Sequence, residues 1–190
     1  MKRYDLWVLV SLSCVLSAAC SKHTSHANAE TMPAAEGGTG LNDGQVLAIY
    51  SQTNTFDIET GQLGDAQGAS GDVRALGHMV ATDHTAVREL ATKLGAKLGL
   101  EASLPAGREE AAADHARVMA ELRALAGPDF DRAYLREEIK FHTDAIQAVK
   151  TVLIPTTKSA ELKKLMTDIL PGFQHHLDET VRISKKLGYE

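Results

Sequence analysis

Histidine side chains recur at positions where a helical pattern asks for apolar residues. His84, His142 and His176 stand in three separate amphipathic stretches, each within a stripe otherwise made of Val, Leu, Ile or Phe. A buried imidazole without a partner costs about 2–7 kcal/mol, so each of these side chains needs a partner inside the protein. Imidazole combined with carboxylate suits zinc, iron, copper or manganese. The pattern therefore predicts either a metal site or a buried hydrogen-bonded network.

Carboxylates in the same stretches are the candidates to complete such a site. Glu59 falls at an expected inward position, Asp83 directly precedes His84, and Glu138 lies one helical turn before His142 on the same face. Carboxylates of this kind either bind the ion or orient the imidazole rings. The predicted metal-site residues are Glu59, Asp83, His84, Glu138, His142 and His176.

The other histidines of the helical region lie off the apolar stripes or in a connecting segment. We expect His78, His115 and His175 at the surface, without a functional role.

Four long helical stretches carry the candidate residues. Capping residues at their starts and glycine or proline at their ends set the expected boundaries. The stretches begin at Asn42 or Asp43, at Ser70, at Gly127 and at Ser159, and the last three end at Gly99, Pro155 and Gly188. The inward positions expected in the first stretch are Val46, Ile49, Gln52, Phe56, Glu59, Leu63 and Ala66.

The connections between these stretches indicate how the helices are arranged. Short turns near residues 69 and 157 predict two antiparallel hairpins. The link from Leu100 to Gly127 is far longer than a hairpin needs and contains a helical stretch of its own, Arg108–Ala126. We therefore predict an all-α four-helix bundle with a long, helix-containing crossover between its second and third helices. A rise of about 1.5 Å per residue puts Glu59 and the three inward histidines within about 6–8 Å of one layer.

Composition narrows the class of protein. The chain has 190 residues, a net charge of −5 and 5 % aromatic residues, which suits one globular domain. The absence of a clustered Lys/Arg face with interleaved aromatic residues argues against a nucleic-acid partner. The sequence shows no Ser–His or Cys–His arrangement that would supply a nucleophile beside a base, so we do not expect an enzyme.

The N-terminus has the features of a secretion signal. Lys2 and Arg3 precede an apolar run from Leu6 to Ala19, which is shorter than the roughly 20 residues of a membrane span. Its ending, VLSAAC, resembles the lipobox of bacterial lipoproteins, in which the cysteine, here Cys20, becomes lipidated. The expected organisation is a signal peptide over 1–19, a lipidated tether over 20–41 and the bundle over 42–190.

This organisation predicts a cell-envelope location. The lipid on Cys20 would anchor the protein to the outer membrane, facing the periplasm, because the Ser21 that follows resembles outer-membrane sorting. A free periplasmic protein is the alternative, since Ser17-Ala18-Ala19 also satisfies an ordinary cleavage rule. The sequence does not identify a protein partner.

Several motifs together resemble a known family. The runs NTFDIETGQLG, HMVATDHTAVRELATKLG, DFDRAYLREEIKFH and ILPGFQHHLDET, in this order, resemble the bacterial exported family called domain of unknown function 4142. The resemblance implies a ferritin-like four-helix bundle without an assigned activity. The residues that match the recurring polar positions of this family are Glu59, Asp83, His84, Tyr134, His142 and His176.

The sequence departs from the di-iron pattern of ferritin-like proteins, which requires Glu-x-x-His on two helices. Ala81, Ile139 and Phe173 stand three residues before the inward histidines. A His-rich mononuclear site is the metal hypothesis that remains. Its alternatives are a structural or protein-interaction module with a buried His/carboxylate network, and a proton-sensitive switch.

Overall fold

The helices begin and end where the sequence supplies caps. The computed structural model describes residues 40–189, so the predicted signal peptide, Cys20 and nearly all of the tether lie outside the described residues. Asn42 caps the first helix, as one of the two residues expected from the sequence, and forms a reciprocal capping box with Gln45. Ser70 and Ser159 cap two further helices through their side chains, and Gly99 and Gly188 end the same two helices in the left-handed conformation.

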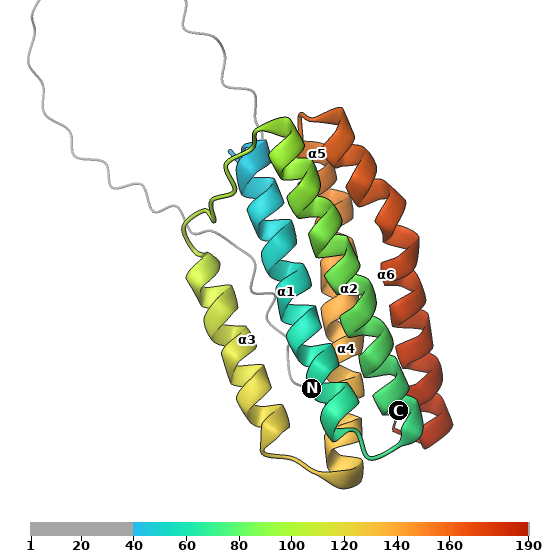
Figure 1. Cartoon of the computed structure of the whole chain (residues 1–190). Coiled ribbons are helices and arrows are strands. Elements are labelled where there is room, and N and C mark those ends of the chain that lie inside the picture. Colours follow the sequence, from blue (N-terminus) through green and yellow to red (C-terminus); the bar gives the residue numbers. More distant parts are fainter. Residues whose placement is uncertain (1–39, 190) are drawn as a thin grey trace, which may run out of the picture. The chain divides into compact units, whose positions relative to one another are not determined.

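The described residues form helices and contain no strand, which confirms the all-α prediction. In Figure 1, α1, α2, α4 and α6 run side by side, and α3 lies outside them next to α1. The elements are α1 (Asp43–Gln67), α2 (Gly71–Leu98), α3 (Arg108–Arg123), α4 (Gly127–Ala148), η1 (Val149–Leu153), α5 (Ile154–Thr156) and α6 (Ala160–Leu187). The helix α3 is the one predicted within the crossover.

The third long helix departs from the expected regular form near its end. Sequence periodicity predicts a single α-helix up to Pro155, but Val149–Leu153 form the π-helical segment η1. Proline lacks an N–H group, and its ring clashes with the carbonyl four residues earlier, here that of Thr151. The wider π turn contains that carbonyl and lets the chain remain helical as far as Thr156.

Glycines set the close contact between α1 and α2. A Cβ placed on Gly77 would lie 2.6 Å from the carbonyl oxygen of Gly61, and one placed on Gly61 would lie 2.8 Å from the backbone nitrogen of Ala81. Both distances are shorter than van der Waals contact, so the two backbones approach to a distance that only glycine permits at these positions. This contact determines which face of α1 is turned inward.

Each of the two hairpin turns is held by a carboxylate from the other hairpin. Asp131, in the first turns of α4, accepts hydrogen bonds of 2.7 and 2.8 Å from the backbone N–H groups of Ala69 and Ser70. Asp43, in the first turn of α1, accepts two bonds of 2.7 Å from the N–H groups of Lys158 and Ser159. These bonds satisfy exposed helix-start donors and fix one hairpin against the other.

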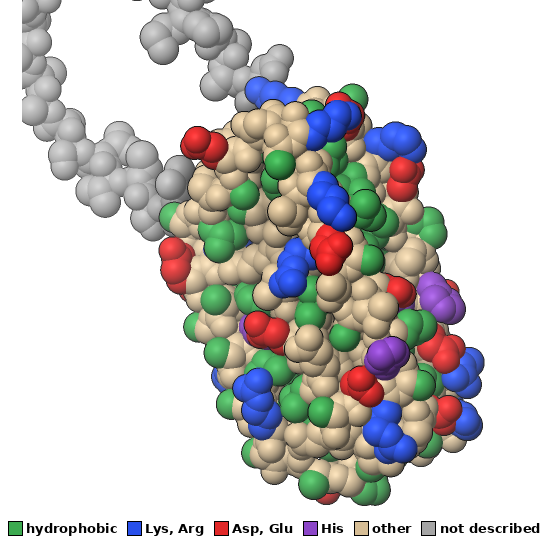
Figure 2. Space-filling model, in the orientation of Figure 1, with side chains coloured by type: hydrophobic (Ala, Val, Ile, Leu, Met, Phe, Trp, Pro, Cys, Tyr) green, Lys and Arg blue, Asp and Glu red, His purple; other side chains and the backbone are tan. Residues whose placement is uncertain are grey.

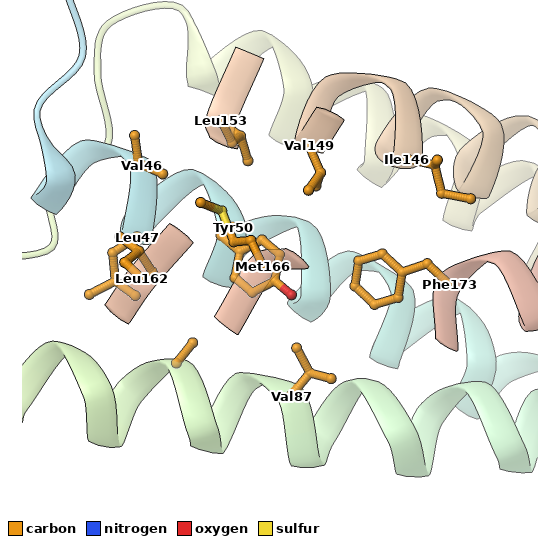
Figure 3. Packing of buried hydrophobic residues seen from close by; sticks show 11 residues of the cluster. Val46, Leu47, Tyr50, Val87, Ile146, Val149, Leu153, Leu162, Met166 and Phe173 are labelled. Atoms are coloured by element: carbon orange, nitrogen blue, oxygen red, sulfur yellow. The ribbon is translucent and has the colours of Figure 1, made fainter. Parts of the chain in front are cut away.

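Two apolar clusters fill the interior of the bundle. In Figure 3, side chains including Tyr50, Met166 and Phe173 from α1 and α6 point into the space between the helices, opposite Val87 of α2. A second cluster around Phe130 and Leu135 fills the part of the bundle near the turn between α1 and α2. Together they leave a polar layer near the middle of the helices, between the two clusters.

The outer surface shown in Figure 2 carries acidic and basic side chains interspersed with one another and with scattered apolar groups. Within residues 40–189, no helix is both long enough and apolar enough to cross a membrane.

Candidate metal centre

The polar layer brings one side chain from each of the four long helices to one place. These are Asp57 from α1, His84 from α2, His142 from α4 and His176 from α6, and each residue is at most 2 % exposed. The prediction that the three histidines share a layer is confirmed. Phe173 closes the layer toward the larger apolar cluster, since its ring stacks on that of His84 at 4.7 Å between centroids.

Four ligand atoms converge in this layer. The Nδ1 atom of His176 lies 3.3 Å from the Nε2 atom of His84 and 3.3 Å from that of His142. Oδ2 of Asp57 lies 2.8 Å from Nε2 of His84 and 3.3 Å from Nε2 of His142.

The opposite nitrogen of each imidazole faces an oxygen acceptor. Asn54 donates from Nδ2 to the carbonyl oxygen of Tyr50 at 2.7 Å, so its Oδ1, 2.9 Å from Nδ1 of His84, accepts a proton from that ring. Nδ1 of His142 lies 3.1 Å from the carbonyl oxygen of Glu138, and so donates to it.

The outer nitrogen of His176 also faces an oxygen acceptor. Nε2 of His176 lies 2.9 Å from the carboxylate of Asp83, to which it donates. In the neutral form of each histidine, these outer bonds hold the proton on the outer nitrogen and leave the converging nitrogen with a lone pair.

Burial favours the neutral form of two of these rings. It lowers the pKa of His142 and of His176, and this effect is larger than the opposing influence of the negative charge of Asp57 on His142 and of the bond to Asp83 on His176. Neutral imidazole is the form that binds metals.

The spacing of the converging atoms suits a small ion. Bonds of about 2.0–2.1 Å from a tetrahedral zinc ion to nitrogen imply separations of about 3.3–3.4 Å between ligand atoms. Of the six separations among the four atoms, three are 3.3 Å, and that between Asp57 and His84 is 2.8 Å. The three histidines form a group whose ligand atoms could hold one ion. Asp57 approaches two of these histidines closely and is the candidate fourth ligand.

A second carboxylate lies beside the centre. Asp57, Glu138 and His142 form another group with ligand atoms close enough to share an ion. Among the described residues, the carboxylate oxygens of Asp57 and Glu138 and the hydroxyl of Tyr134 are buried without an aligned hydrogen bond. The close approach of Asp57 Oδ2 to Nε2 of His84, at 2.8 Å, is thus a contact that no well-directed hydrogen bond holds.

The two carboxyl groups differ in their preferred charge. Burial and then the charge of Asp57 raise the pKa of Glu138 well above its usual range. Burial would also raise the pKa of Asp57, but its interactions with His84 and His142 outweigh this effect and lower that pKa. Asp57 is therefore the anionic member of the pair.

The prediction that Glu59 lies in the layer of the three histidines is wrong. Its side chain is 49 % exposed and lies 2.8 Å from Nε2 of His115 on α3, so it is not part of the buried layer. His115 in turn is largely covered, because its ring stacks on Phe56 at 4.3 Å between centroids, so the surface position expected for it is also wrong. His78 and His175 are exposed as expected.

The other predicted residues lie at or beside the centre. His84, His142 and His176 provide the converging nitrogens, Asp83 orients His176, and Glu138 is buried against His142, with 3.5 Å between its Oε2 and Nδ1 of the ring. Asp83 differs from the others because its side chain is 56 % exposed.

Sequence reasoning missed Asp57 and Asn54. Both are buried residues of α1, and the others are Gly44, Val46, Leu47, Ala48, Tyr50, Ile58, Thr60, Gly61 and Gly64. The steps from Tyr50 to Asn54, Asp57, Gly61 and Gly64 alternate between four and three residues, which is the seam spacing of packed helices. This alternation, with glycine counted as an inward residue, was the signal that could have found them.

Comparison with family models gives one match. A model described as a domain of unknown function (DUF4142) matches residues 27–183. Comparison with curated proteins and with solved structures gives no significant match.

Proposed function

Because the chain belongs to the DUF4142 family, whose description assigns no activity, we propose from the geometry of the site that the bundle binds a divalent transition metal ion. The ligands are Asp57, His84, His142 and His176. The observation that carries the proposal is the convergence of four buried lone-pair donors, with the proton of each ring held on its outer side. In a dry interior such donors repel one another unless a cation lies between them.

The donor set narrows the class of ion. Three imidazoles and one carboxylate are ligands of borderline hardness, which suit zinc, iron, copper, nickel or cobalt and disfavour calcium or magnesium. The negative charge of Asp57 favours a divalent over a monovalent ion. Asn54, the Glu138 carbonyl and Asp83 orient the rings from outside.

The arrangement of two helix hairpins joined by a long crossover supports a ferritin-like bundle as the architecture of this proposal. The Glu-x-x-His pattern of di-iron proteins does not occur at the three inward histidines. The proposed centre is accordingly mononuclear and His-rich, and not a di-iron store.

Metal content and affinity test this function directly. The protein purified without chelator, and then titrated with Zn²⁺ or Co²⁺, is expected to bind one equivalent. His84→Ala and His142→Ala should abolish stoichiometric binding, whereas Glu59→Gln, which removes an exposed carboxylate of the same helix, should leave it unchanged. Equal binding by all four proteins, or none by the wild type, would show that the histidines form a hydrogen-bonded network and would favour the structural or protein-interaction module.

The sequence before the bundle supports an envelope location for this function. We propose that the protein is exported and that a lipid on Cys20 attaches it to the outer membrane, with the bundle in the periplasm. Cys20→Ser should move the protein from the membrane fraction to the soluble periplasmic fraction of the cell. Unchanged fractionation would leave the free periplasmic protein as the correct alternative.

A further inference from the structure

A groove between α2 and α6 leads from the surface to the centre. Its volume is about 280 Å³, and its lining includes Asp83 and Leu90 of α2 and Asp168, Phe173 and His176 of α6. Of these, Phe173 and His176 are buried and belong to the polar layer, whereas Asp83, Leu90 and Asp168 are exposed. One metal-binding histidine therefore lies against a surface groove.

The three outer partners of the histidines differ in their access to solvent. Asn54, behind His84, and Glu138, behind His142, are each 1 % exposed. The side chain of Asp83, behind His176, is 56 % exposed, although its Oδ2 lies only 2.9 Å from the ring nitrogen. The path from His176 through Asp83 thus joins the buried centre to solvent.

Gly172 of α6 lines the groove and adds no side chain to it. A Cβ placed on Gly172 meets no heavy atom within 4 Å, other than those of its chain neighbours and local helix backbone. The residue lies inside α6 and does not have a positive φ, so the helix itself does not require glycine here. A larger side chain at this position would meet open space at a point where the residue lines the groove.

We infer that metal ions enter and leave the centre through the groove between α2 and α6, with Asp83 as the outer ligand that receives the ion and passes it to His176. This inference rests on the proposed function. Asp83 brings a negative charge to the entrance, which attracts a hydrated cation, whereas Asp168 at the same groove is paired with Lys164. His176 is the ligand that moves during exchange, because its outer partner is the one at the surface.

The inference makes the centre an exchangeable site and not a closed structural one. A structural ion needs four permanent protein ligands and no route to solvent. Here three of the ligands, Asp57, His84 and His142, stay fixed by buried partners or packing, and the fourth can open toward Asp83. A protein built in this way takes up ions and releases them while it remains folded.

Exchange kinetics separate the route from the affinity. The Zn²⁺-loaded protein is mixed with a chromogenic chelator, and the release rate is measured; uptake by the metal-free protein is measured with Co²⁺. Gly172→Leu fills the groove and should slow both rates at least about tenfold without changing the dissociation constant. Gly172→Ala gives the same gain in helix propensity without filling the groove, and should behave as the wild type.

Two further variants act on the route in other ways. Leu90→Ala removes a 48 % exposed side chain from the groove and should speed release. Asp83→Asn should slow uptake and weaken binding about 10–100-fold, which is the range for loss of an outer-shell partner. The matched control is Asp144→Asn, which changes another exposed helical carboxylate, one that is paired with Lys140. It should leave the uptake rate and the affinity unchanged.

The outcomes are distinguishable. Wild-type rates in both Gly172→Leu and Leu90→Ala, with one ion still bound, would overturn the route while the proposed function stands. Failure of the wild-type protein to bind an ion would overturn both. Slow exchange in Gly172→Leu with fast exchange in Leu90→Ala would establish the groove as the path.

Discussion

Substitution of Asp57 by Asn tests the residue of the centre that the sequence did not identify. The amide has the size of the carboxylate but lacks its charge, so Asp57→Asn leaves the packing of α1 in place and replaces the one anionic donor of the centre by a weak neutral one. Asp57 is 0 % exposed, so a water molecule cannot replace its carboxylate as a ligand unless the helices rearrange. The expected result is loss of the stabilisation that metal binding gives to the folded protein.

The magnitude follows from linkage between binding and folding. At a free ion concentration 100 times the wild-type dissociation constant, a bound ion stabilises the folded state by about 2.7 kcal/mol. Outer-shell changes already weaken metal binding about 10–100-fold, and loss of a ligand costs at least as much. A 100-fold weaker site retains only about 0.4 kcal/mol under the same conditions. For a domain of this size, the melting temperature should rise by about 5–11 °C in the wild type and about 1–2 °C in the variant.

Thermal unfolding followed by circular dichroism, with and without buffered Zn²⁺, measures this difference. Glu59→Gln is the matched control, because it removes a carboxylate two residues further along α1 whose side chain is 49 % exposed. The control should show the full metal-dependent shift. An equal shift in Asp57→Asn and the wild type would refute the assignment of Asp57 as a ligand and reduce the centre to the three histidines.

Three other outcomes follow from the fold and the charges. Gly77→Ala should destabilise the protein by about 1–3 kcal/mol or more in urea unfolding, because its Cβ would lie 2.6 Å from the carbonyl oxygen of Gly61; a smaller loss would mean that α1 and α2 separate easily. Asp131→Ala should cost about 1.5–3 kcal/mol in the same assay, through two lost charge-assisted hydrogen bonds, whereas Asp129→Ala, at an exposed carboxylate, should cost little. Glu138→Gln should gain stability relative to the wild type as pH rises from 5 to 8 in metal-free protein. The unfolded chain releases the Glu138 proton near pH 4.5, whereas the folded chain holds it to higher pH. Through this group, rising pH therefore favours unfolding of the wild type and not of the variant. A difference in unfolding free energy between the two proteins that does not change with pH would contradict the raised pKa of Glu138.

Most of the fold could be predicted because its signals are local. Capping residues such as Ser70, Asn42 and Ser159 act on the next three residues of the chain, and they mark helix starts wherever the helices later pack. The apolar stripes of α2, α4 and α6 are regular, so the positions of their histidines follow from the period of the helix. The π-helical turn before Pro155 is also local, but periodicity did not predict it. A helix can respond to an internal proline in several ways of similar energy, so the sequence does not select one of them.

The face of α1 is where periodicity failed. Its apolar pattern is weak, and Ile49, Phe56 and Leu63 suggested a stripe that includes Glu59. In the folded protein, glycines opposite α2 let the two backbones approach, and this contact turns Asp57 inward instead. A hydrophobicity pattern does not predict whether a glycine faces inward or outward. It therefore could not predict the glycine contact that orients this helix.

By itself, the sequence determined that the chain forms four long helices in two hairpins, with three histidines in one buried layer, because helix caps and helical periodicity depend only on nearby residues. The tertiary structure alone decided that Asp57 joins those histidines, which nitrogen of each ring faces inward, and that Asp83 alone among their outer partners reaches solvent. Each of these features depends on the distance and rotation between helices. Those are set by contacts between residues about 30 to 90 positions apart, such as Asn54 with His84 and His84 with His176.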